Sequence, residues 1–156
     1  PIIQFETELI LQGHEEEVIE KCLKKTAEEV LKGSKILLLS VDTLLNRNSI
    51  LKENSSIKSE HSLRIVETIG KTVERLNNMY GLYAIISAGG DTSLQICKAF
   101  ESSFIKLLEE IKPGIPLGKM IGGKGDSMLI VTKSGGFGDE NLLVQIIQYL
   151  KTFHDS

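Results

Sequence analysis

The sequence predicts an α/β fold in one domain, residues 1–156, with helices flanking a mixed, largely parallel sheet. Two observations predict this class. Over residues 2–100, short apolar runs alternate with longer segments of helical periodicity, which is the pattern of strands connected by helices. Over residues 104–132, three apolar runs follow one another with only short glycine- or proline-containing turns between them, and this indicates that the sheet is mixed.

The first elements are a short strand over Ile2–Phe5 and a helix over His14–Leu31. In the second segment apolar residues recur every three or four positions, and charged residues occupy the opposite face. Three consecutive glutamates, residues 15–17, suit the first turn of this helix because the helix dipole favours negative charge there. Gly33 is suited to ending the helix. The continuous apolar run Lys35–Val41 then predicts a strand that is covered on both faces.

A polar segment rich in Ser, Asn and Lys, Asn46–Ser59, predicts a loop. A second helix is expected from about Ser59 to Tyr80, and Gly81 is suited to ending it. Its apolar stripe consists of Leu63, Val66, Ile69, Val73 and Leu76.

The second half of the chain begins with a strand over Leu82–Ser87, followed by a helix that Asp91 or Thr92 could cap. The chain is expected to end in a helix over Asp139–Phe153. Three further strands are expected between these helices, over Phe104–Ile111, Leu117–Ile121 and Met128–Thr132.

Two glycine-rich turns carry most of the functional information. One reads Ser87-Ala-Gly-Gly-Asp-Thr92, and the other reads Lys133-Ser-Gly-Gly-Phe-Gly-Asp139. Each follows an expected strand and precedes an expected helix, so its unpaired backbone N–H groups and the helix dipole suit an anion. Ligands of open α/β sheets bind at the carboxyl ends of strands, where both turns lie. Two such turns in one small domain indicate a polyphosphate, most simply a nucleotide.

In the first turn, Gly89 and Gly90 would let the backbone approach a phosphate closely, since neither carries a Cβ. Thr92 would add a hydroxyl donor. Asp91 could face a magnesium ion through water, because nucleotide-bound Mg²⁺ keeps several water ligands. The alternative is that this is only a tight strand-to-helix turn with an aspartate cap.

In the second turn, Lys133 would neutralise phosphate charge, Ser134 would donate a hydrogen bond, and Gly135 and Gly136 would permit close approach. The alternative is a flexible loop between a strand and a helix. The sequence contains neither the Walker A pattern nor the dinucleotide-binding glycine fingerprint. The turn at residues 113–118 is either a simple strand connection or one wall of a base or ribose pocket.

Composition excludes several other classes. A net charge of −3, a pI near 5.7 and the absence of Trp argue against a nucleic-acid surface. No apolar run is long enough to span a membrane, so we expect no membrane partner. Cys22 and Cys97 lack metal-site spacing, and we interpret both as buried thiols of a protein in the reducing cytoplasm. No residue pattern indicates a catalytic triad.

Three blocks together resemble the C-terminal nucleotide-binding domain of the four-carbon acid sugar kinase family. They are SAGGDTS at residues 87–93, KPGIPLGKM at residues 112–120 and VTKSGGFGDE at residues 131–140. The resemblance implies a two-domain kinase that transfers the γ-phosphoryl group of ATP, with Mg²⁺, to the terminal hydroxyl of threonate, erythronate or an oxo-tetronate. In such enzymes the N-terminal domain holds the acid sugar and the C-terminal domain holds ATP.

The resemblance also implies that Gly89, Gly90, Asp91, Thr92 and the Gly135–Gly136 turn contact the ATP phosphates. The substrate domain of the family is absent from residues 1–156, so we expect this chain to be part of a longer kinase. We therefore expect no catalytic residue in it and no activity from it alone. Two alternatives stay open: a stand-alone sensor of a nucleotide or phosphorylated metabolite, and an interaction protein whose glycine turns are structural. A homo-oligomer is also open, because apolar helix faces fit a dimer interface as well as a core.

Overall fold

A computed structural model of the chain describes residues 1–42, 55–136 and 138–153. Its N-terminal part is built around a two-stranded parallel sheet in which Ile2 pairs with Leu38 and Phe5 pairs with Val41. The elements of this part are β1 (Ile2–Phe5), α1 (Thr7–Leu11), α2 (Glu15–Leu31), β2 (Leu38–Val41) and α4 (Ser55–Tyr80).

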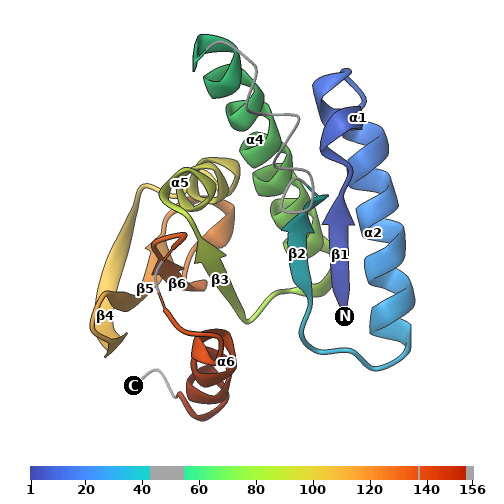
Figure 1. The fold of residues 1–156 in the computed structure, drawn as a ribbon. Helices are drawn as coiled ribbons and strands as arrows, with labels where there is room; N and C mark the ends of the chain where they lie inside the picture. Colours follow the sequence, from blue (N-terminus) through green and yellow to red (C-terminus); the bar gives the residue numbers. More distant parts are fainter. Residues whose placement is uncertain (43–54, 137, 154–156) are drawn as a thin grey trace.

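The C-terminal part is built around a four-stranded sheet with the strand order β3-β6-β5-β4. The pairing of β3 with β6 is parallel, and the other two pairings are antiparallel. Helices α5 and α6 lie on opposite sides of this sheet (Figure 1). The elements are β3 (Ala84–Ala88), α5 (Gly90–Ala99), β4 (Phe104–Lys112), β5 (Ile115–Ile121), the 3₁₀ turn η2 (Gly123–Gly125), β6 (Leu129–Lys133) and α6 (Leu142–Thr152).

The predicted α/β class, with mixed strands flanked by helices, is confirmed. The strands are divided between two sheets, however, and parallel and antiparallel pairings are equally common in the described residues. The antiparallel pairing of β4 with β5 arises because a tight turn at Pro113–Gly114 joins the two strands. A connection that short cannot return the chain to the start of a parallel strand.

Three local predictions were wrong. The sequence predicted a strand over Lys35–Val41 that is covered on both faces. The structure has only the shorter strand β2 there, and Leu38 is 43% exposed on the open face of the small sheet. The last residues of the predicted loop, from Ser55, are helical in α4, and the rest of that loop lies outside the described residues. Neither Asp91 nor Thr92 caps α5, because the helix begins at Gly90 and Gly89 occupies the capping position.

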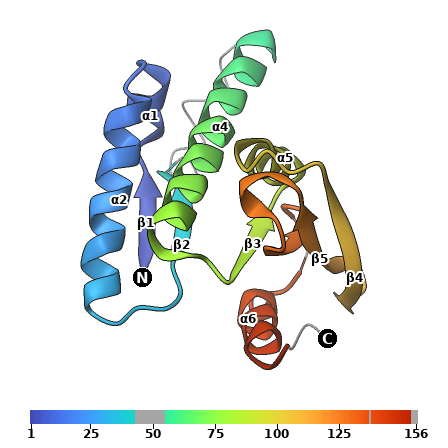
Figure 2. The ribbon, with the colours of Figure 1, turned by 180° about the vertical axis from the view of Figure 1, so that it is seen from behind.

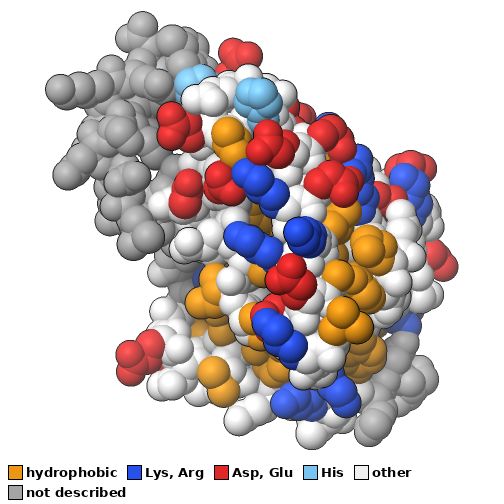
Figure 3. All heavy atoms as spheres, turned by 90° about the vertical axis from the view of Figure 1, so that its right-hand side faces the viewer, with side chains coloured by type: hydrophobic (Ala, Val, Ile, Leu, Met, Phe, Trp, Pro, Cys, Tyr) orange, Lys and Arg blue, Asp and Glu red, His pale blue; other side chains and the backbone are white. Residues whose placement is uncertain are grey.

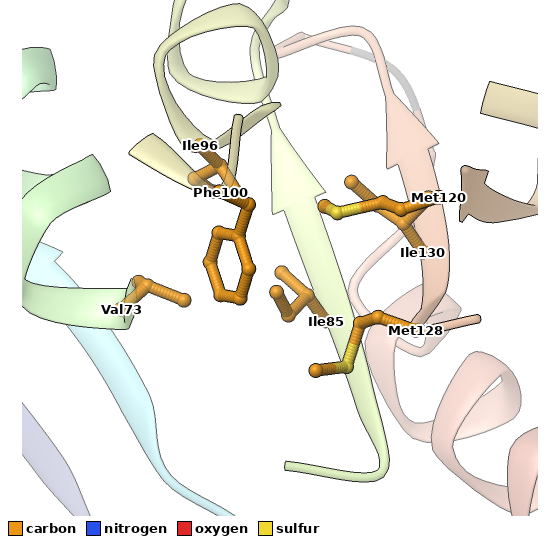
Figure 4. Close-up of a cluster of buried hydrophobic side chains, with 7 residues drawn as sticks. All are labelled: Val73, Ile85, Ile96, Phe100, Met120, Met128 and Ile130. Atoms are coloured by element: carbon orange, nitrogen blue, oxygen red, sulfur yellow. The ribbon is translucent and has the colours of Figure 1, made fainter. Parts of the chain in front are cut away.

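Helix α4 lies between the two sheets in both ribbon views (Figures 1 and 2). It contributes Val73 to a core on one face of the four-stranded sheet, where Phe100 points toward Val73 and Ile85 (Figure 4). It also contributes Ile65 and Ile69 to the core beneath β1 and β2. One helix therefore joins two cores that are built from different segments of the chain. A separate core on the far face of the larger sheet packs against α6.

Ion pairs also connect α4 to α2. Glu15 accepts hydrogen bonds from the guanidinium of Arg64, with an Nε–Oε1 distance of 3.1 Å. Glu16 and Glu20 pair with Arg75 at 2.7 and 3.3 Å. Glu15 and Glu16, two of the three glutamates predicted for the first turn of α2, thus also bind the neighbouring helix. Acidic and basic side chains are interleaved on this side of the molecule (Figure 3).

The two thiols are both free. Cys22 is buried, as predicted, and burial raises its pKa to about 11. Cys97 is only half-buried, and burial raises its pKa as well. Within the residues that the structure describes, no helix is long and apolar enough to cross a membrane.

We predict that Gly70→Ala destabilises the fold. Gly70 lies where α4 crosses α5, and a Cβ there would approach the backbone oxygen of Gln95 to 2.6 Å. The two helices would have to separate, which typically costs about 1–3 kcal/mol. Urea denaturation measures the change. Gly136→Ala is the matched control, because a Cβ at Gly136 meets nothing within 4 Å; equal stabilities of the two variants would contradict the packing argument.

We predict that the stability contributed by Glu15 depends on pH. The hydrogen bond from Arg64 lowers the pKa of Glu15 below the usual 4.5. Because the folded pKa is the lower one, the contribution is present above the unfolded value and is lost as pH falls through the folded value. Glu15→Gln should therefore lower the thermal midpoint at neutral pH, with a difference from wild type that shrinks in acid. Glu20→Gln is the control, and it should change the thermal midpoint little because the Glu20 side chain is 69% exposed. An effect of Glu15→Gln that does not depend on pH would refute the stabilising role of the Glu15–Arg64 pair.

Candidate functional site

The two glycine turns leave the same edge of the four-stranded sheet. Strands β3 and β6 are neighbours and run parallel, with Ala84 opposite Leu129 and Ala88 opposite Lys133. At the end of this pairing the backbone N–H of Gly89 donates to the carbonyl of Lys133 at 2.9 Å. Because β5 runs antiparallel to β6, the turn that precedes β5 lies at this edge too. Three loops that are distant in sequence thus meet at one place.

A cavity of about 460 Å³ lies where these loops meet. This volume is within the range of small-molecule binding sites. Its walls come from the start of α5, the end of β6 and the turn before β5. The lining residues are Gly90, Ser93, Gly114, Pro116, Thr132, Lys133 and Ser134.

The start of α5 has backbone donors beside this cavity. The first bond of the helix runs from the N–H of Ser93 to the carbonyl of Gly89, at 3.0 Å. The N–H groups of Gly90, Asp91 and Thr92 precede that bond, so they have no acceptor within the helix and lie at the positive end of its dipole. Gly89 itself contributes a left-handed backbone, with a φ of 103°, and its N–H is occupied by Lys133.

A pair of hydroxyls holds the first turn in shape. The Ser93 Oγ lies 2.9 Å from the Oγ of buried Ser87 and 2.9 Å from the carbonyl oxygen of Gly89. Ser87 also pairs in register with Thr132, which lines the cavity. The interaction ties the start of α5 to the end of β3. It therefore fixes the direction in which the free N–H groups of the helix point.

In the second turn, the half-buried Lys133 folds back on its own loop. Its Nζ donates to the carbonyl of Ser134 at 2.8 Å and to that of Gly135 at 3.3 Å. Gly138 needs to be glycine, because its φ is 101° and a Cβ would collide with Leu142. Gly135 and Gly136 have no such constraint: neither φ is left-handed, and a Cβ would meet no atom within 4 Å. The fold alone does not require glycine at these two positions, and the same holds for Gly90.

The structure thus places the predicted residues on two adjoining turns and brings three of them into the cavity wall: Gly90, Lys133 and Ser134. The others lie beside them in the chain but outside the lining: Gly89, Asp91, Thr92, Gly135 and Gly136. Ser93 and Thr132 were missed, since nothing in the sequence distinguishes them from other hydroxyl residues. Gly114 and Pro116 also line the cavity, and their role as a base or ribose wall stays a prediction.

Comparison with known proteins shows which family the chain belongs to. Residues 1–143 match the family model described as the nucleotide-binding C-terminal domain. This chain belongs to that family. It is 31% identical over 87 residues to a D-threonate kinase of Bordetella bronchiseptica, covering 56% of the chain and 22% of that enzyme. It is 32% identical over 72 residues to a D-erythronate kinase of Heliobacterium modesticaldum, covering 46% of the chain and 16% of that enzyme. The chain is therefore a C-terminal domain of the four-carbon acid sugar kinase family, and it spans about a fifth of these curated relatives.

Solved structures share the fold. A Bordetella bronchiseptica protein, described as a domain of unknown function with bound citrate and a domain-swapped dimer, matches the whole chain with a TM-score of 0.76 and 19% identity. The match covers 36% of that protein. In a second crystal form the match covers 58% of this chain and 23% of the other, with 30% identity and a TM-score of 0.56. A Haemophilus influenzae protein matches 96% of the chain and 34% of its own length, with a TM-score of 0.68 and 19% identity.

We predict that Ser93→Ala destabilises the first turn. It would remove the partner of a buried hydroxyl on Ser87, and an unsatisfied buried polar group costs about 1–3 kcal/mol. Chemical denaturation measures the loss. Ser134→Ala, at an exposed position of the second turn, is the control and should change stability by less than about 0.5 kcal/mol. If the two variants were equally stable, the hydroxyl pair would have no structural role.

Proposed function

We propose that this chain is the ATP-binding half of a kinase that phosphorylates the terminal hydroxyl of a four-carbon acid sugar, such as threonate, erythronate or an oxo-tetronate. The observation that carries the proposal is the convergence of two glycine turns, from neighbouring parallel strands, on one cavity. The nucleotide-binding family and the names of the kinase relatives support it. The chain spans only part of those kinases, so the activity belongs to the proposal.

The phosphates of ATP would lie between the two turns. The N–H groups of Gly90, Asp91 and Thr92 would donate to phosphate oxygens, and the dipole of α5 would stabilise their charge. Ser134 would add a hydroxyl donor. Lys133 would exchange the carbonyls of its own turn, at 2.8 and 3.3 Å, for phosphate oxygens, which form stronger charge-assisted bonds. Gly135 and Gly136 would leave room for the phosphates beside the backbone.

Magnesium is part of the proposal. Bound with ATP, Mg²⁺ would neutralise the negative charge that develops on the phosphates during transfer. Asp91 is exposed in the first turn of α5, so its carboxylate is accessible to a hydrated ion through a water ligand. Among the described residues no cluster of three or more His, Cys, Asp or Glu could hold a metal ion, so phosphate oxygens and water would supply most of the ligands.

We assign no catalytic residue to this chain. Phosphoryl transfer depends on positioning and charge neutralisation more than on covalent chemistry, and this domain would position the donor. The group that orients the attacking hydroxyl is expected on a substrate domain outside residues 1–156. ATP binding without transfer to any acid sugar by the full-length gene product would favour the sensor alternative.

Self-association is a separate proposal. The Bordetella bronchiseptica structures are described as domain-swapped dimers, and we extend dimer formation to this chain. Light scattering after size-exclusion chromatography tests it, and a monomer at all concentrations would reject it.

The test of the nucleotide site is Gly136→Val in the full-length gene product. Since a Cβ at this position meets no protein atom within 4 Å, the fold should be unaffected while the space for phosphate is lost. We expect ATP affinity, measured by calorimetry, to fall by at least about tenfold, equivalent to about 1.4 kcal/mol. Gly136→Ala should have a smaller effect. Unchanged ATP affinity in a folded Gly136→Val protein would remove this turn from the site.

A further inference from the structure

The peptide between Gly89 and Gly90 is the most permissive link of the first turn. Neither residue carries a Cβ, so the peptide plane can rotate with little steric hindrance. The carbonyl of Gly89 and the N–H of Gly90 belong to the same trans peptide and therefore point in opposite directions. Because Gly90 lines the cavity, rotation of this peptide would replace a donor by an acceptor beside the ligand site.

Ser93 holds the carbonyl end of this peptide with two hydrogen bonds. Its backbone N–H donates to the carbonyl oxygen of Gly89 at 3.0 Å, and its Oγ donates to the same oxygen at 2.9 Å. A carbonyl oxygen has two lone pairs, so both are used within the turn. The carbonyl of Gly89 is thereby directed toward α5, and the N–H of Gly90 points away from the helix.

The hydroxyl of Ser93 has only one proton to donate. The carbonyl of Gly89 can only accept, so that proton is used there. The second contact of the Ser93 Oγ, at 2.9 Å from the Oγ of Ser87, is then supplied by the proton of Ser87. Ser93 lines the cavity, yet in this arrangement its hydroxyl has no proton left for a phosphate oxygen.

We propose that Ser93 is a positioning residue for the phosphate site. Together with Ser87 it holds the Gly89–Gly90 peptide in the orientation that leaves the N–H of Gly90 available to a phosphate oxygen. The inference rests on the proposed function, because it takes the ligand to be a nucleotide. Donors that are already oriented bind more tightly than donors that must first be ordered. Ser87 is 3% exposed and lies outside the cavity lining, so it acts only through Ser93.

Calorimetric titration of the full-length gene product with Mg·ATP tests the inference. Ser93→Ala should weaken binding about threefold to tenfold, because the carbonyl of Gly89 loses one of its two hydrogen bonds. Ser87→Ala should weaken binding about twofold to fivefold, because the Ser93 hydroxyl loses the partner that orients it. The double variant should bind within about twofold of Ser93→Ala, since both substitutions act through one hydroxyl.

Two further variants separate positioning from a loss of stability. Ser93→Thr keeps the hydroxyl and should bind Mg·ATP within about twofold of wild type. Ser102→Ala is the matched control, because the Ser102 Oγ also donates to backbone carbonyls, those of Phe104 and Ile121 at 3.2 Å, but beyond the other end of α5. It should leave the affinity unchanged. Thermal denaturation identifies a temperature at which every variant is folded, and all titrations are made there.

Each contrary result has a distinct meaning. If Ser93→Ala weakened binding and Ser87→Ala did not, Ser93 would be a direct ligand and the inference would be overturned. Wild-type affinity in folded Ser93→Ala would limit the hydroxyl pair to stability and would also overturn it. Multiplying effects in the double variant would show that the two hydroxyls act independently. In these three cases the wild type still binds Mg·ATP and the proposed function stands, whereas a folded wild type that did not bind it would reject both.

Discussion

The parallel pairing of β3 with β6 determines where the candidate site lies. It brings the end of β3 beside the end of β6, and the hydrogen bond from Gly89 to Lys133 closes that pairing at its last residues. Both turns must then leave the sheet at the same edge. Gly90, at the start of α5, and Lys133 consequently line one cavity, although they lie far apart in the sequence.

The glycines of the chain fall into two groups, according to whether the fold itself requires glycine at the position. Gly70, Gly89 and Gly138 are required by the fold, either because a Cβ would collide with a neighbour or because φ is left-handed. Gly90, Gly135 and Gly136 meet neither condition, and all three lie on the turns that adjoin the cavity. Glycine in an element or turn carries an entropic cost, so three glycines without a structural reason point to a requirement imposed by a ligand. This contrast connects the local backbone to the proposed phosphate site more directly than the motifs alone.

The positions of most elements could be predicted from the sequence because glycines, prolines and apolar periodicity mark them. The partners of the strands could not, since nothing local to Leu129–Lys133 indicates that it pairs with Ala84–Ala88. Helix α1 was missed because five residues are too few to show a period. In the site, the glycine turns were visible as patterns, whereas Ser93 and Thr132 acquire their roles only from a hydrogen bond and a register that exist in the fold.

The most direct test of the account is an amide chemical-shift map of the chain, by ¹H–¹⁵N NMR, during titration with a non-hydrolysable Mg·ATP analogue. The account predicts that the largest shifts occur at the amides of Gly90, Asp91 and Thr92 and of Gly135 and Gly136, with small shifts at the opposite edge of the sheet around Tyr83 and Ser127. Saturable binding with the largest shifts at that opposite edge, and none at the two glycine turns, would contradict it.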